Sequence, residues 1–116
     1  MYLSVIIPAY NEEKRLAKTL TEIDKYLRNQ NYHSEIIVVD GGSKDKTREI
    51  VREKMAEIKN LKLVEIEGKG KGHAVRVGML EAQGDFRIFT DADNSTSIDQ
   101  VEKMWPEFKA GFDVVI

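Results

Sequence analysis

The chain has 116 residues, 41% of them hydrophobic, and its 18 Lys and Arg against 20 Asp and Glu leave a formal net charge of −2. This length suits one domain with a single core, and the near-neutral charge argues against the broad positive field that duplex nucleic acid requires. The absence of cysteine excludes disulfides, cysteine zinc sites, iron–sulfur clusters and a thiol nucleophile, so any bound metal would be held mainly by oxygen.

The first third of the chain predicts a strand, a helix and a second strand. Residues 3–8 are a short β-rich run that Pro8 would end, and Asn11 is a favourable N-cap for the helix that follows. That helix has apolar positions at helical spacing, namely Leu16, Leu20, Ile23 and Leu27. Residues 35–40 form a continuous apolar run ending in Asp40, which is typical of a buried parallel strand.

The same pattern continues through the middle of the chain. A helix is predicted over 45–58, with Ile50, Val51, Met55 and Ile58 on its apolar face, and a third strand over 61–66. The glycine-rich, basic loop 68–72 precedes a helix predicted over 73–83, with Gly84 at its end. A fourth strand is predicted over 86–89.

The last part of the chain predicts one more helix and strand. Ser97 to Gln100 form a capping box that opens a fourth helix, in which Pro106 would introduce a kink. Its expected apolar stripe is Ile98, Val101, Trp105 and Phe108, and residues 113–116 begin a fifth strand. The alternation predicts an α/β fold, one domain over 1–116 with a parallel sheet covered by helices on both faces.

No apolar run approaches the ~20 residues that span a bilayer, and the N-terminus lacks the basic region of a signal peptide. We therefore expect a cytoplasmic location. Polar and glycine-rich segments fall at the predicted carboxyl ends of the strands, where open α/β sheets bind ligands. This coincidence predicts a charged or phosphorylated ligand above the first, second and fourth strands.

Asp91 and Asp93 are the clearest metal-ligand candidates. Two carboxylates one residue apart can share a divalent cation with the phosphate oxygens of a nucleotide, although a solvated turn that caps the next helix explains them equally well. Asp40 could accept a hydrogen bond from a nucleobase, or could cap the turn at Gly41 and Gly42.

Two further segments have open interpretations. Tyr10 offers a flat face to a base or ribose, whereas Glu12 and Glu13 could simply complement a helix dipole. The loop 68–72 matches neither a Walker A motif nor G-x-G-x-x-G, and is either an anion neighbour or a solvated loop. Arg76 could reach the paired carboxylates or lie on the surface.

Four motifs in order resemble the nucleotide-binding half of family 2 glycosyltransferases with the GT-A fold. They are SVIIPAYNEE at 4–13, IVVDGGSKDKT at 37–47, GKGHAVRVGM at 70–79 and FTDAD at 89–93. Within the family they look most like dolichyl- and polyprenyl-phosphate glucosyltransferases, followed by dolichyl-phosphate mannose synthases. One departure is Gly41, which stands where the family usually has a second aspartate.

The resemblance implies a role for each matching residue. Pro8, Tyr10 and Glu12 would line the nucleoside pocket and Asp40 would bind the base. Asp91 and Ala92 would contact ribose and phosphate, and Asp93, with Asp91, would hold Mg²⁺ or Mn²⁺.

The expected activity is inverting transfer of a hexose from a nucleotide sugar of the UDP-glucose or GDP-mannose type to a polyprenyl phosphate or glycan acceptor. Catalytic and acceptor-binding residues, and any membrane contact, are expected beyond residue 116, so this part alone is expected to be inactive. A stand-alone nucleotide-binding module is the alternative if the chain ends there. A sugar-1-phosphate nucleotidyltransferase is a weaker alternative, because it needs a glycine-rich basic loop where this chain has residues 8–13.

Overall fold

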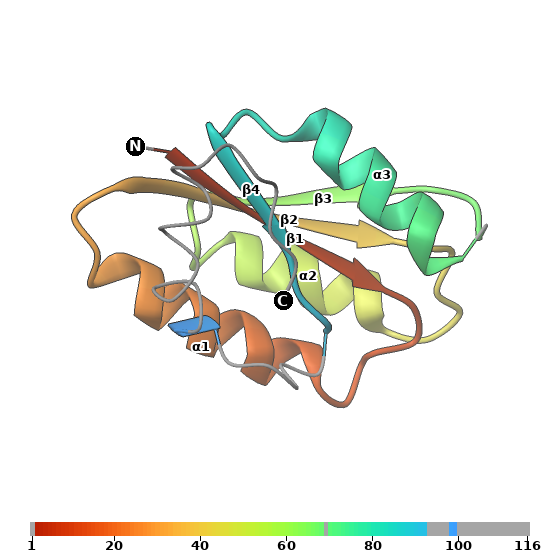
Figure 1. The fold of residues 1–116 in the computed structure, drawn as a ribbon. Coiled ribbons are helices and arrows are strands. Elements are labelled where there is room, and N and C mark those ends of the chain that lie inside the picture. Colours follow the sequence, from red (N-terminus) through yellow and green to blue (C-terminus); the bar gives the residue numbers. More distant parts are fainter. Residues whose placement is uncertain (1, 69, 93–97, 100–116) are drawn as a thin grey trace.

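The computed structural model describes residues 2–68, 70–92 and 98–99, and within them four parallel strands form one sheet in the order β3-β2-β1-β4 (Figure 1). The strands are β1 (Tyr2–Ala9), β2 (His33–Asp40), β3 (Leu61–Glu65) and β4 (Phe86–Phe89). The helices are α1 (Leu16–Arg28), α2 (Thr47–Met55) and α3 (Lys71–Glu81). The predicted parallel α/β sheet is confirmed.

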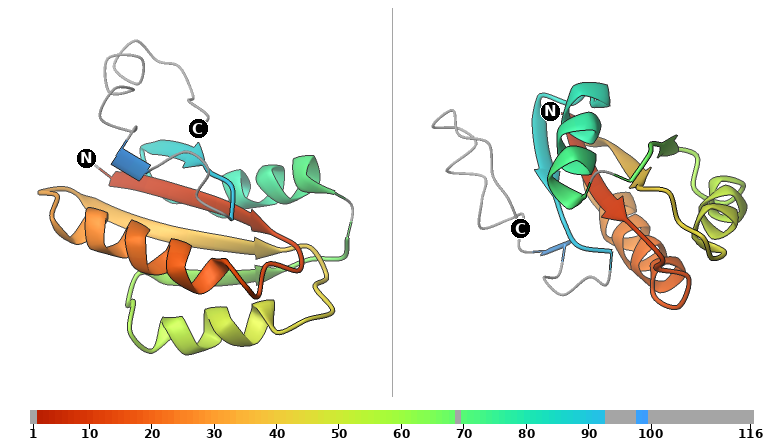
Figure 2. Two further views of the ribbon diagram at one scale, coloured as in Figure 1. Left: turned by 90° about the horizontal axis from the view of Figure 1, so that it is seen from below. Right: turned by 90° about the vertical axis from the view of Figure 1, so that its right-hand side faces the viewer.

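The sheet lies between two layers of helices, with α1 and α2 on one face and α3 on the other (Figures 1 and 2). Successive side chains of the central strands pack on opposite faces of the sheet. Val5 and Ile7 belong to the core beneath α1 and α2, whereas Ile6, Ile37 and Val39 pack with Ala74 of α3. Burial on both faces explains why the two central strands read as continuous apolar runs.

Pro8 ends only one of the two hydrogen-bonding ladders of β1. Pairing with β2 continues past it to Ala9 and Asp40, so the prediction that the strand stops at Pro8 was wrong. Toward β4, the register ends at Ile6 and Phe89, and the N–H of Thr90 donates to Ile6 O. Pro8 is the next residue facing that side and has no N–H to offer.

Helix α1 begins at Leu16, and the predicted N-cap at Asn11 was wrong. Asn11 has a positive φ of 52°, and its side-chain oxygen accepts a hydrogen bond from Lys44 N at 2.9 Å. The carbonyl of Glu12 instead accepts from the N–H groups of Arg15 and Leu16. A contact with a distant loop therefore displaces the start of the helix.

Helix α2 is shorter than predicted and its apolar face is narrower. It ends at Met55, which is exposed, and Ile58 is buried only after the chain has left the helix through a turn. Val51 is the buried apolar residue within α2. Asp45 precedes the helix, and its Oδ1 accepts from the N–H of Thr47 at 2.9 Å, as a capping carboxylate does.

Helix α3 starts two residues earlier than predicted, at Lys71, and ends at Glu81. Gly84 is therefore not its cap. An added Cβ at Gly84 would lie 2.5 Å from Ser4 Oγ, so this glycine allows the chain to pass closely over β1. Gly78 allows α3 to pack closely on β1, because a Cβ at this position would lie 2.4 Å from Ile6 Cγ2.

A buried carboxylate lies near the amino-terminal ends of the strands. Glu35 of β2 is 1% exposed and accepts hydrogen bonds from Ser4 Oγ, from Lys62 Nζ at 2.8 Å and from Gln83 N at 2.7 Å. Burial raises the pKa of Glu35, but these hydrogen bonds and the Lys62 charge outweigh it and hold the pKa below its ordinary value. The carboxylate joins three strands to the segment that follows α3.

Several sequence predictions concern residues that the structure does not describe. They are the fourth helix with Val101, Trp105, Pro106 and Phe108, the strand at 113–116, and Asp93. Across the described part of the chain, no helix has the length and apolar character needed to cross a membrane.

Candidate functional site

The carboxyl ends of the four parallel strands meet at one edge of the sheet, and a cavity of about 510 Å³ opens there. Strand β1 lies between β2 and β4; the chain reaches β2 through α1 on one face and reaches β4 through α3 on the other. The helices thus diverge on either side of the β1–β4 junction. A crevice at such a junction is where open α/β sheets bind ligands.

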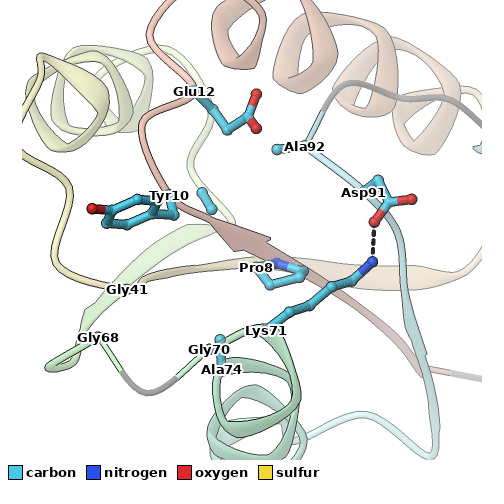
Figure 3. Close-up of a pocket in the computed structure, with 11 residues that line it drawn as sticks. Pro8, Tyr10, Glu12, Gly41, Gly68, Gly70, Lys71, Ala74, Asp91 and Ala92 are labelled. Carbon is cyan, nitrogen blue, oxygen red and sulfur yellow. Dashed lines mark hydrogen bonds and ion pairs between the residues drawn. The ribbon is translucent and has the colours of Figure 1, made fainter.

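Four segments that are distant in sequence line the cavity (Figure 3). The lining residues are Pro8, Ala9, Tyr10, Glu12, Gly41, Gly68, Gly70, Lys71, Ala74, Asp91 and Ala92. Five of the seven predicted nucleotide-binding residues are among them, namely Pro8, Tyr10, Glu12, Asp91 and Ala92. Of the remaining two, Asp40 is described but does not line the cavity.

The turn after β1 presents an aromatic ring to the cavity. Tyr10 is 54% exposed, which leaves its ring accessible to a planar ligand. Glu12 follows the left-handed Asn11, and its carboxylate pairs with Arg15 at 2.6 Å. Glu12 precedes α1 rather than lying in its first turn, so the helix-dipole explanation does not apply to it.

Asp40 is fully buried at the end of β2. Its Oδ2 accepts from the N–H groups of Gly42 and Ser43, at 3.1 and 3.0 Å, and its Oδ1 accepts from the Ser43 hydroxyl. The Arg48 Nε lies 3.6 Å from Oδ2. This is the turn-capping arrangement considered as the alternative for Asp40, and its contact with a base stays a prediction.

The opposite wall of the cavity carries a pair of opposite charges. Lys71, in the first turn of α3, forms an ion pair with Asp91 after β4 (Figure 3). Its ammonium lies 5.6 Å from the centre of the Phe89 ring. The neighbouring Ala92 is anchored, because its carbonyl accepts from Thr19 Oγ1 of α1 at 2.7 Å. The wall is therefore fixed in place while its charged groups stay accessible.

The donor chemistry at Asp91 suits a hard divalent cation. Mg²⁺ is commonly held by one or two carboxylates together with substrate phosphates, and Asp91 supplies one such carboxylate at the cavity rim. Within residues 2–68, 70–92 and 98–99, no group of three or more metal-ligating side chains is present. A cation here would thus depend on further oxygens, such as those of a phosphorylated ligand; Asp93 lies outside the described residues, and its role as a metal ligand stays a prediction.

Sequence reasoning offered the loop 68–72 as an anion neighbour but did not name Lys71 individually as a cavity residue. The signal was present, since a basic residue in a glycine-rich loop at a helix start favours anions. Arg76, the cation considered instead, is exposed and does not line the cavity. Gly41 and Gly68 belong to segments predicted to lie at the ligand-binding edge but were not named as site residues; they approach so closely that a Cβ on Gly68 would lie 2.8 Å from Gly41 O.

Comparison with known proteins gives a consistent family match. Residues 4–116 match the family described as "Glycosyl transferase family 2". The chain is 40% identical over 116 residues to the "Dolichyl-phosphate beta-glucosyltransferase ALG5A" of Trichomonas vaginalis, covering 95% of this chain and 36% of that protein. It therefore spans about a third of the length of the curated relatives that it matches.

Two solved structures share the fold. S. aureus TarS 1–349 in complex with UDP-GlcNAc matches with a TM-score of 0.72 and 31% identity, over 92% of this chain and 32% of that one. The mannosyltransferase PcManGT from Pyrobaculum calidifontis, in complex with GDP-Man and Mn²⁺, matches with a TM-score of 0.65 and 32% identity. That match covers 78% of this chain and 27% of the mannosyltransferase.

Proposed function

The chain belongs to glycosyl transferase family 2, and on that premise we propose that its cavity binds the nucleotide of a sugar donor, for inverting transfer of a hexose to a polyprenyl phosphate. One observation carries the proposal: an accessible aromatic ring and a charged pair face the same cavity at the carboxyl ends of β1 and β4. A nucleoside diphosphate has a planar base and a charged diphosphate, which match these two walls.

Different residues of the cavity are proposed to bind different parts of the nucleotide. Tyr10 and Pro8 provide surfaces for the base and ribose, and the Glu12 carboxylate accepts hydrogen bonds from hydroxyl groups. Lys71 neutralises part of the diphosphate charge and orients it near Asp91. Asp40 is proposed to act in base recognition, and Ala92 to contact the donor through its backbone.

A Mg²⁺ or Mn²⁺ ion held by Asp91 and Asp93 would stabilise the negative charge that develops on the departing nucleoside diphosphate. The proposed acceptor phosphate is itself an anion and needs little general-base assistance. Support for this acceptor class comes from the relatives, which are named dolichyl-phosphate beta-glucosyltransferases. A lipid acceptor also implies that the whole protein works at a membrane surface.

The metal assignment predicts a specific loss in the Asp93→Ala variant. UDP-glucose and GDP-mannose binding would be measured by calorimetry with and without Mn²⁺. We expect Mn²⁺ to tighten binding of the preferred donor about tenfold in the wild type, equivalent to ~1.4 kcal/mol, and to have little effect in Asp93→Ala. Asp85→Ala is a suitable control, because Asp85 is exposed and lies at the amino-terminal end of β4, whereas the cavity lies at the carboxyl ends of the strands.

Metal-independent donor binding that is unchanged in Asp93→Ala would refute the metal site. Absence of donor binding in the wild type, with or without Mn²⁺, would refute the proposed function itself.

The Lys71→Met variant is expected to change the affinities for UDP and for Mn²⁺ in opposite directions. Without metal, we expect UDP affinity to fall about fivefold, because a favourable charge near the diphosphate is lost. Without nucleotide, we expect Mn²⁺ affinity to rise, since the ammonium no longer competes for Asp91. Calorimetry with UDP alone and with Mn²⁺ alone separates the two; a parallel fall of both affinities would contradict this role for Lys71.

A further inference from the structure

Three consecutive backbone N–H groups of the cavity-lining turn are held by side chains from a distant loop. The N–H of Asn11 donates to Ser43 Oγ at 2.8 Å, and the N–H of Glu12 donates to Thr47 Oγ1 at 2.8 Å. The N–H of Glu13 donates to Asp45 Oδ2 at 3.3 Å. These contacts join residues 32 to 35 positions apart and tie the β1–α1 turn to the β2–α2 loop.

The turn needs this external support. Its N–H groups lie between the end of β1 and the start of α1, so neither element supplies them with acceptors. Asn11 also has a φ of 52°, a left-handed conformation that is uncommon outside glycine and that asparagine adopts more readily than most other residues. The loop compensates further, because Lys44 N donates back to Asn11 Oδ1 and Lys46 N to Glu13 Oε2.

Each hydroxyl is itself oriented by a carboxylate. Ser43 Oγ donates to Asp40 Oδ1, and Thr47 Oγ1 donates to Asp45 Oδ1. With its proton committed to a carboxylate, each hydroxyl can only accept from the backbone N–H that faces it. The structure therefore contains two similar relays, Asp40–Ser43–Asn11 N–H and Asp45–Thr47–Glu12 N–H.

The ionisation of Asp45 supports the second relay as described, in which the Thr47 hydroxyl donates to Asp45 and accepts from the Glu12 N–H. Burial raises the pKa of Asp45, but hydrogen bonds from the Thr47 hydroxyl, Thr47 N–H and Glu13 N–H outweigh it and hold the pKa below its ordinary value. Asp45 is thus an ionised acceptor at neutral pH.

Neither hydroxyl is placed to touch a ligand. Thr47 is fully buried, Ser43 is 2% exposed, and neither lines the cavity. The residues that do line it, Tyr10 and Glu12, flank the left-handed Asn11. A change in the turn's backbone would consequently move the Tyr10 ring and the Glu12 carboxylate relative to β4.

We propose that Ser43 and Thr47 are positioning residues that fix the Tyr10–Glu12 turn in the conformation that receives the nucleoside, without contacting it. The inference rests on the proposed nucleotide-binding function and explains how one wall of the site is held. Lys71 belongs to α3 and Asp91 follows β4, so neither is part of these relays; the link of this wall to α1 is the separate hydrogen bond from Thr19 Oγ1 to Ala92 O.

The decisive variants are Thr47→Val, which keeps the shape but removes the hydroxyl, and Thr47→Ser, which restores it. We expect UDP affinity in Thr47→Val to fall about tenfold, while affinity for inorganic pyrophosphate with Mn²⁺ stays within twofold of the wild type. Thr47→Ser should recover UDP affinity to within about threefold. Thr21→Val, at an exposed threonine of α1 whose hydroxyl donates to Ala17 O and accepts from Lys54 Nζ, is the matched control and should change neither affinity.

Amide hydrogen exchange in the ligand-free protein tests the relay separately from binding. We expect exchange at the Glu12 N–H to speed up at least tenfold in Thr47→Val and to stay near wild type in Thr47→Ser. Ser43→Ala provides the same test at the Asn11 N–H if Thr47→Val does not fold.

Unchanged exchange, or equal proportional losses of UDP and pyrophosphate affinity, would overturn the positioning role. A wild-type protein that binds no UDP would instead contradict the proposed function, and the exchange data would still decide whether the relays hold the turn.

Discussion

Replacing Gly78 with valine is expected to lower the free energy of unfolding by about 3 kcal/mol, the upper end of the usual range for overpacking. A Cβ at this position would lie 2.4 Å from Ile6 Cγ2 and 3.1 Å from Val39 Cγ2. Both neighbours are fully buried in the central strands and have no free space to enter. Helix α3 must therefore move away from the sheet.

Urea unfolding followed by far-UV circular dichroism measures this loss. Gly72→Ala is the matched control in the same helix, because no atom lies within 4 Å of an added Cβ there. We expect it to raise stability by up to ~1 kcal/mol through helix propensity. Equal stability of Gly78→Val and the wild type would mean that α3 does not pack on β1 and β2 as described.

The same displacement should weaken ligand binding. Lys71 and Ala74, at the amino-terminal end of α3, line the cavity, so moving the helix changes the distance between Lys71 and Asp91. We therefore expect Gly78→Val to bind UDP more weakly than Gly72→Ala under conditions in which both are folded.

Removing the buried carboxylate in Glu35→Ala is expected to destabilise the protein by about 3 kcal/mol at pH 7. The substitution leaves the buried Ser4 hydroxyl and the Gln83 N–H without their shared acceptor and opens a cavity. It also separates Lys62 of β3 from its partner. Glu65→Ala is the control, because its ion pair with Arg52 is exposed and contributes less than ~1 kcal/mol.

The loss in Glu35→Ala should depend on pH in a defined direction. The pKa of Glu35 is lower in the folded protein than its ordinary value of 4.5, so the ionised carboxylate stabilises the fold fully above about pH 4.5. This contribution disappears as the pH falls through the folded pKa. Urea unfolding at several pH values should show the difference between wild type and Glu35→Ala shrinking below pH 4.5; a constant difference would contradict the assignment.

The sheet could be predicted from the sequence because its signals are local. Strands β1 and β2 are continuous apolar runs followed by polar turns, and parallel strands bring those turns to one edge. The strand ends therefore predict that Tyr10 and Asp91 lie in a common site, and both line the cavity. Their positions follow from strand ends alone.

The boundaries and the roles of single side chains depend on contacts that the sequence does not display. Asn11 looks like an N-cap, but Lys44, 33 residues away, engages its side chain. The hydrogen bonds from Gly42 N–H and the Ser43 hydroxyl to the buried Asp40 carboxylate are likewise not visible in the sequence, and the contact of Asp40 with a base stays a prediction. Lys71 was predicted to lie in the loop 68–72 rather than in the helix, because the glycines around it obscured where α3 begins.

The strand order also has a consequence for how the protein is made. Leu3 pairs with Phe86, so the first strand synthesised must wait for a partner that leaves the ribosome about 80 residues later. At ~5–20 residues per second that interval is several seconds, during which one edge of a highly apolar strand has no partner. Slowing translation before Phe86 is therefore expected to lengthen the exposure of this edge and to increase the aggregated fraction of newly made protein.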